Sequence, residues 1–194
     1  MSYRTKLFEV LPLAGLFEYM RDWQHFNDEI ELLKKYGVIQ GFRDLWWDTR
    51  PNPEFGTIEV RVCDLPVKFT GILALVAMIQ STVAWILEEV QSASPLNPYL
   101  LKSNKWQAAR YGLEGRFIDP TAILGEHPMQ FRLAAMILKS KISTYASKLG
   151  CESYLDNLDS IISGGTGADQ MRRIYQNTGD FHRVVRDIQK EFWQ

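Results

Sequence analysis

The feature that most constrains the fold is the segment 46–64, which reads WWDTRPNPEFGTIEVRVCD. Within it, Ile58, Val60 and Val62 alternate with polar or charged residues and a cysteine, and this period of two is typical of a β-strand. A second run with the same period precedes it. Residues 51–56 (PNPEFG) lie between the two runs, and two prolines with a glycine favour a stiff, defined turn. The segment is therefore predicted to form a β-hairpin.

Such a hairpin should have one aliphatic face and one face that carries Asp48, Arg50, Glu59 and Arg61. A face on which carboxylates lie beside arginines can hold a divalent cation and a phosphate together, as an ATP-dependent ligase requires. Alternation alone favours an ordinary sheet with one solvated face. The mixed charges and the lack of lysine favour a functional face instead. Both interpretations stay open at this point.

The composition is that of a soluble globular protein. The chain has 194 residues, is 46% hydrophobic and carries a net charge of −1, which predicts one domain over residues 1–194 with a real core. A charge this close to zero gives no general attraction to nucleic acid or to anionic lipid. Two cysteines, Cys63 and Cys151, do not make a disulfide framework, and no signal peptide is recognised. We therefore expect a cytoplasmic protein with reduced thiols.

Outside the hairpin the sequence is predicted to be mostly helical. Residues 70–87 form an uncharged run that reaches the lower limit for a membrane span, but polar residues at its centre favour a helix buried in a globular core. A membrane-associated protein is the alternative. Residues 3–16 and 112–125 are expected to be loops. The expected helices cover residues 17–36, 70–87, 97–112, 128–149, 151–163, 168–177 and 180–192.

A hairpin of two strands is marginally stable alone. Either further strands lie within the predicted loops, or another chain completes this sheet. The sequence pattern leaves both alternatives open.

Two other motifs could bind anions, and each has an ordinary structural explanation. In SGGTGADQMRR (residues 163–173) glycines precede a helix, but no strand leads into it and the Lys-Ser/Thr of a P-loop is absent. A turn between helices, capped by Thr166 or Asp169, is favoured.

The second motif is a stripe of Lys102, Trp106 and Arg110 at four-residue spacing. It could form a cationic wall for a phosphate or carboxylate. Without other information it is better explained as a surface stripe whose side-chain stems cover the tryptophan.

The block DTRPNPEFGTIEVRVCD resembles the D-x-R-P…T-x-E-x-R-x-x-D signature of the glutamate–cysteine ligase type 2 family, the carboxylate–amine ligases of bacteria. Further blocks are similar to the same family in the same order. They are SYRTKLFEVLPLAG, NKWQAARYGLEG, GTGADQMRR and GDFHRVVRDI. The resemblance therefore extends over essentially the whole chain.

The resemblance implies an α+β, helix-rich fold similar to that of glutamine synthetase, in which a curved antiparallel sheet forms a funnel. It also implies an activity. ATP, held with Mg²⁺ or Mn²⁺, phosphorylates the γ-carboxylate of glutamate, and an amine such as that of cysteine then displaces phosphate.

Carried onto this chain, the resemblance assigns Glu59 to the metal, whose hard character suits carboxylate oxygen. Arg61 and Arg50 match arginines expected near the transferred phosphate, where a planar fork suits phosphate oxygens. Asp48 is expected to orient an arginine or to accept from a substrate ammonium group. Residues expected more weakly, from matching blocks alone, are Arg4 and the nucleotide-binding candidates Lys102 and Arg110.

One departure from the family matters. Family members are roughly twice this length, and their first half supplies a glutamate-rich, metal-binding strand that has no counterpart here. The chain is thus expected to be a C-terminal portion that acts as a homo-oligomer or in complex with an N-terminal half. The alternative is a non-catalytic scaffold or partner subunit of such a ligase.

Overall fold

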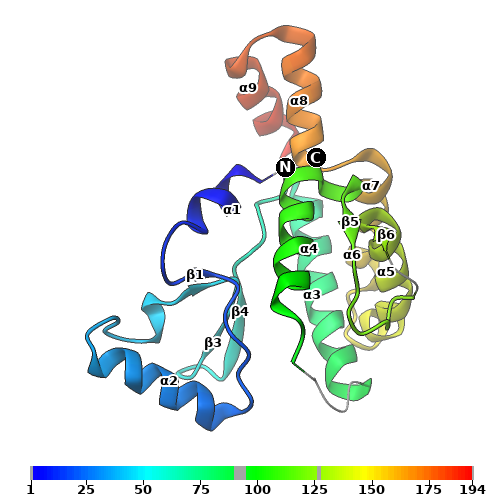
Figure 1. Cartoon of the computed structure of the whole chain (residues 1–194). Helices are drawn as coiled ribbons and strands as arrows, with labels where there is room; N and C mark the ends of the chain where they lie inside the picture. The colour runs from blue at the N-terminus through cyan, green and yellow to red at the C-terminus, as the bar shows by residue number, and fades with distance from the viewer. Residues whose placement is uncertain (1, 90–94, 126–127, 194) are drawn as a thin grey trace. The chain divides into compact units, whose positions relative to one another are not determined.

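The computed structural model describes residues 2–89, 95–125 and 128–193. The chain divides into two compact units, each with its own core (Figure 1). We call residues 2–64 with 95–105 the N-terminal unit, and the described residues from 65 to 89 and from 106 to 193 the C-terminal unit. Many helices and three small sheets agree with the predicted α+β, helix-rich class. Two compact units are compatible with one cooperative domain or with two, so the single domain stays a prediction.

Local capping fixes where the helices of the N-terminal unit begin. The Asp22 carboxylate accepts from the backbone N–H of His25 at 2.7 Å, so the helix predicted from Phe17 begins only at Trp23. Ser2 caps a short helix in the segment predicted to be a loop. The elements of this unit are α1 (Tyr3–Phe8), β1 (Ala14–Gly15), α2 (Trp23–Lys35), the 3₁₀ turn η1 (Phe42–Asp44), β2 (Trp46–Trp47), β3 (Thr49–Asn52), β4 (Thr57–Val60) and the first part of α4 (Pro98–Tyr111).

The predicted hairpin is confirmed. β3 and β4 pair antiparallel, with Arg50 opposite Glu59. A further strand was hidden in a predicted loop, because β1 pairs parallel with β2 and places Ala14 beside Trp46. β1 and β2 form a sheet of their own, so the hairpin remains two-stranded within the described residues.

The charged face of the hairpin is its more buried face, unlike in the ordinary sheet with a solvated charged face that alternation alone favours. Ile58, Val60 and Val62 are 63%, 38% and 36% exposed, whereas Arg50 is only 6% exposed. The charged face turns inward because the Arg50 guanidinium finds acceptors there, as described below. The core of this unit is made by Phe26, Ile30, Ile39, Leu45 and Trp47.

The C-terminal unit is built mainly from helices. α4 enters this unit at Trp106, but it begins in the N-terminal unit, where Asn97 accepts from the backbone N–H of Tyr99 at 2.9 Å and so fixes the start of α4 at Pro98, as predicted. A third short sheet, β5 with β6, lies in a predicted loop and at the predicted start of a helix. The elements are α3 (Phe69–Glu89), the end of α4, η2 (Gly112–Glu114), β5 (Arg116–Phe117), β6 (Met129–Gln130), α5 (Phe131–Lys148), α6 (Glu152–Leu155), α7 (Leu158–Gly164), α8 (Gly167–Thr178) and α9 (Phe181–Glu191).

α3 contains the uncharged run of the sequence, and it is long and apolar enough to cross a membrane by length and composition. It packs instead against α5, α6 and α7 within this unit. Its packed stripe is made mostly of small side chains, which allow close helix approach, and the buried residues are Gly71, Ala74, Ala77, Ser81 and Trp85. Only 28% of the apolar window of α3 is buried, and Val83 and Leu87 are 41% and 80% exposed, so the predicted burial in a core holds for one stripe of the helix alone.

Candidate functional site

Arg50, on β3, is the centre of the charged face of the hairpin. Its Nη2 donates to Glu59 Oε2 at 2.7 Å, and its Nη1 donates to the backbone oxygens of Arg43 at 2.7 Å and Leu45 at 3.1 Å. Its Nε is buried without an acceptor among the described residues. A buried guanidinium with three acceptors is held in one geometry, so Arg50 fixes both the preceding loop and the facing carboxylate.

The carboxylate of Glu59, on β4, accepts hydrogen bonds from three side chains. Besides Arg50, Asn52 donates to its Oε1 at 3.1 Å, and Arg61 approaches its Oε2 at 3.4 Å. The hydrogen bond from Arg50, followed by that from Asn52, lowers the pKa of Glu59 below its ordinary value. The carboxylate therefore stays ionised near neutral pH and holds two guanidinium groups beside each other.

A hollow of about 110 Å³ lies in the N-terminal unit, with Asp48 and Arg61 among its lining residues. Lys105, from α4, also lines it, and its Nζ lies 2.6 Å from Asp48 Oδ2 and 3.2 Å from Glu9 Oε1. The hollow therefore brings together cationic and anionic groups from α1, α4 and the connections around the hairpin. Arg4, a weaker candidate from the sequence, lines it as well.

Lys105 is the site residue that sequence reasoning missed. The Lys105 side chain is only 11% exposed. The two predicted cations of the same helix do not take part in the hollow. Lys102 is exposed and does not line it, and Arg110 is exposed and belongs to the C-terminal unit. Gly15, with φ at +97°, lies against the lysine, since a Cβ there would be 3.4 Å from Lys105 Nζ. The signal was available, because Lys105 stands in the family-like block NKWQAARYGLEG.

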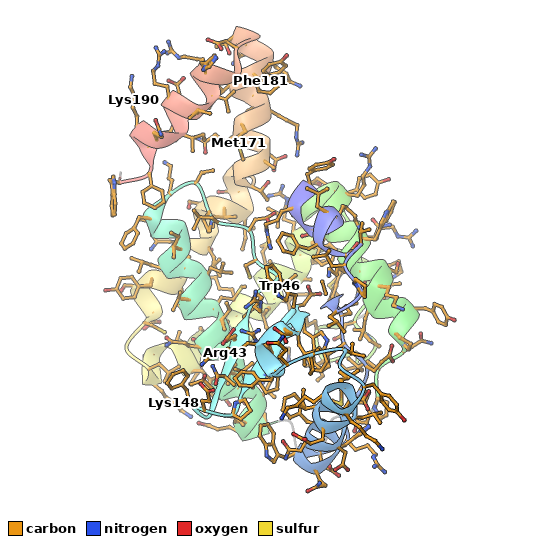
Figure 2. The ribbon with its side chains drawn as sticks, turned by 90° about the vertical axis from the view of Figure 1, so that its left-hand side faces the viewer. Arg43, Trp46, Lys148, Met171, Phe181 and Lys190 are labelled. Atoms are coloured by element: carbon orange, nitrogen blue, oxygen red, sulfur yellow. The ribbon has the colours of Figure 1, made fainter. Side chains whose placement is uncertain are left out.

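Aromatic rings fix the arginines around the hollow. Trp46, labelled in Figure 2, stacks on Phe8 with ring centroids 5.3 Å apart, and the Arg61 guanidinium lies 5.4 Å from the Trp46 ring centroid. Arg4 lies over Phe8 and donates from Nε to Asp64 at 2.7 Å. Arg61 is thus held between a carboxylate and a ring, and it remains one-third exposed toward the hollow.

No group of three or more His, Cys, Asp or Glu side chains that could hold a metal is found in residues 2–89, 95–125 and 128–193. Glu59, the predicted ligand, is already engaged by two guanidinium groups. These residues by themselves do not fit a complete metal site. Both Cys63 and Cys151 are free thiols, and burial raises the pKa of Cys63, which makes it a poor nucleophile.

The glycine-rich motif forms the predicted capped turn. α8 begins at Gly167, and Asp169 Oδ2 accepts from the backbone N–H of Thr166 at 2.8 Å and from its hydroxyl at 2.7 Å. Burial alone would raise the pKa of Asp169, but these hydrogen bonds outweigh it and lower the pKa. The predicted turn between helices, capped by Thr166 and Asp169, is thus confirmed.

Relatives align with this chain over almost its whole length. A relative from Gloeobacter violaceus, named as a candidate glutamate–cysteine ligase 2, is 36% identical over 191 residues, which cover 97% of this chain. Relatives from Legionella pneumophila and Solibacter usitatus with the same name are 34% and 31% identical over 99% and 95% of this chain. The aligned regions make up 50%, 50% and 48% of these three relatives, so the chain spans about half of their length.

The model of one protein family matches nearly the whole chain. This family is described as glutamate–cysteine ligase family 2, and the match covers residues 1–187. The match contains the hairpin, the hollow beside it and the capped turn before α8. The chain therefore belongs to glutamate–cysteine ligase family 2.

Proposed function

We propose that this chain supplies part of the active site of an ATP-dependent carboxylate–amine ligase that joins glutamate to an amine such as cysteine. The observation that carries the proposal is the cluster of Arg50, Glu59 and Arg61, which stands beside a charged hollow in a member of this ligase family. The proposed route is phosphorylation of the substrate carboxylate by ATP, followed by displacement of phosphate by the amine.

Each residue of the cluster has a role that its contacts support. Arg61 lines the hollow and is partly exposed there, so its guanidinium is the group we assign to phosphate oxygens. Arg50 is buried, and we assign it the role of positioning Glu59 rather than binding substrate. Asp48 Oδ2 and Lys105 Nζ lie 2.6 Å apart and neutralise each other's charge, so we assign to Asp48 the role of orienting the lysine side chain. Phosphoryl transfer depends mainly on such positioning and charge neutralisation.

We propose that Glu59 contributes one carboxylate to a Mg²⁺ or Mn²⁺ site whose other ligands come from outside the described residues. The chain spans half the length of its relatives, and no complete metal cluster exists in the described part of the chain. The exposed aliphatic face of the hairpin supports the same view. A larger, glutamine synthetase-like sheet would form if strands from the other half paired with the edge of the hairpin and other parts of that half covered its aliphatic face.

The experiment measures glutamate-dependent ADP release. The chain is assayed alone and after co-expression with the other half of the Gloeobacter violaceus relative. We expect ADP release from the combined protein only, and its loss in the Glu59→Gln and Arg61→Ala variants because both groups act in the site. Glu54→Gln is the matched control, since Glu54 pairs with Arg43 on the exposed turn outside the hollow.

Full activity in both Glu59→Gln and Arg61→Ala would overturn the site assignment. Formation of a stable complex with no ADP release under any condition would favour the alternative, a non-catalytic scaffold or partner subunit. The absence of a complete metal cluster among the described residues is compatible with that alternative too.

A further inference from the structure

A second hollow, of about 400 Å³, lies in the C-terminal unit and shares no residue with the hollow around Asp48 and Arg61. Its walls come from η2, the start of α5, the end of α7 and one face of α8. The volume lies in the range of pockets that bind small molecules. Nothing in the proposed ligase function uses this hollow.

One face of α8 forms a wall of this hollow. Asp169, Arg172, Arg173 and Gln176 all line it, and their spacing of i, i+3, i+4 and i+7 places them on one side of the helix. Other α8 side chains pack against α9, which forms a helix pair with α8 (Figure 1). The ring centroids of Tyr175 on α8 and Phe181 on α9 lie 4.3 Å apart. The polar face is therefore not needed to hold the two helices together.

Three guanidinium groups line the hollow, and two of them have carboxylate partners. Arg132 pairs with Glu114, and Arg172 Nη1 lies 3.2 Å from Asp169 Oδ1. Arg173 makes no ion pair with the described residues, and its Nη1 donates only to the backbone oxygen of Gly164 at 3.3 Å. The lining thus has one positive charge in excess, on a planar fork with further donors to offer.

We propose that this hollow binds a small molecule that presents an oxyanion, either a phosphate or a carboxylate group. Arg173 is the principal contact, because a guanidinium binds such groups through two parallel hydrogen bonds. Gln176 stands one turn from Arg172 on the same face, and its side chain forms no hydrogen bond within the described residues, so its amide can donate to the same ligand.

The test is calorimetric titration of the intact chain with pyrophosphate and, separately, with succinate, at constant ionic strength. We expect saturable binding of at least one probe, weakened about tenfold or more in Arg173→Gln, because one charge-assisted pair is lost. Gln176→Ala should also weaken binding. Arg183→Gln is the matched control, since Arg183 is a cation of α9 that pairs with Asp187 at 2.8 Å and does not line the hollow.

Binding of pyrophosphate alone identifies a phosphate carrier as the ligand, and binding of succinate alone identifies a carboxylate. Binding of both supports a general oxyanion site. Absence of saturable binding, or an equal effect of Arg183→Gln and Arg173→Gln, would overturn the proposal, because the arginines would then be an ordinary solvated helix face. The readout is heat of binding to the chain itself, so this result is independent of ADP release and of the proposed ligase activity.

Discussion

At the scale of single residues, Arg50 shows how a charged side chain can be part of a core. It is 6% exposed, yet it has two backbone oxygens and a carboxylate as acceptors. Burying a charge is costly unless it is paired and hydrogen-bonded, and here it is both. The sequence placed Arg50 on the charged face correctly, but it could not show that this face turns inward, because alternation gives the two faces without saying which one is buried.

We expect Arg50→Lys to destabilise the folded chain by about 2 kcal/mol. A lysine keeps the charge but cannot reach three acceptors in the fork geometry, which leaves polar groups unsatisfied inside the unit. The measurement is the free energy of unfolding from urea denaturation. Arg43→Lys is the control and should change stability by no more than about 0.5 kcal/mol, since its pair with Glu54 is exposed. Equal effects of the two substitutions would contradict the role given to Arg50.

At the scale of elements, the longer helices could be predicted, whereas the short helix α1, most helix boundaries and the short strands could not. The amphipathic and apolar periodicities located α2, α3, α5, α8 and α9. Capping side chains, which a periodicity does not contain, set the starts of α2, α8 and α9. β1, β2, β5 and β6 have two residues each, too few to show any alternation. The hollow beside the hairpin is lined by residues of β1 and α4 as well as by residues around the hairpin. Asp48 and Arg61 could be found within the hairpin segment, whereas Lys105 lies far from that segment in the sequence and was missed.

The end of α3 is joined to α5 by a hydrogen-bonded carboxylate that should make stability depend on pH. Glu89 accepts from the Tyr145 hydroxyl at 2.6 Å and from the Trp85 indole at 3.0 Å, and these bonds lower the pKa of Glu89 below its ordinary value of 4.5. A lowered folded pKa stabilises the protein above the unfolded pKa, and this contribution is lost as the pH falls through the folded value. The same contact raises the pKa of Tyr145 to about 12, so a second contribution is lost as the pH rises from about 10 through 12.

We therefore predict that Glu89→Gln flattens the loss of stability on acidification. The measurement is the urea midpoint at pH 6 and at pH 3.5 for the native and variant chains. Glu88→Gln provides the comparison, because Glu88 lies next to it in an exposed pair with Lys148. If Glu88→Gln flattened the profile as much as Glu89→Gln does, the hydrogen bonds of Glu89 would not be the cause.

At the scale of the whole molecule, the exposed aliphatic face of β4 is the feature that most needs explanation. Antiparallel sheets usually bury their aliphatic face and solvate their polar one, and this hairpin does the opposite. The arrangement becomes reasonable if the chain works with the other half of the length found in its relatives, whose strands would cover Ile58, Val60 and Val62. An inverted hairpin then keeps the arginines in place while it presents an apolar surface for assembly.

This view predicts the outcome of Ile58→Asp in the chain co-expressed with the other half of the Gloeobacter violaceus relative. A carboxylate at the centre of a buried apolar contact would be desolvated without a partner, so the complex should dissociate into its two components. Light scattering after size-exclusion chromatography measures the mass directly. Val10→Asp places the same charge on another exposed aliphatic position of the N-terminal unit, outside the hairpin, and should leave the complex intact. Persistence of the complex in Ile58→Asp would show that its partner contacts a different surface, and the exposed face would then need another occupant.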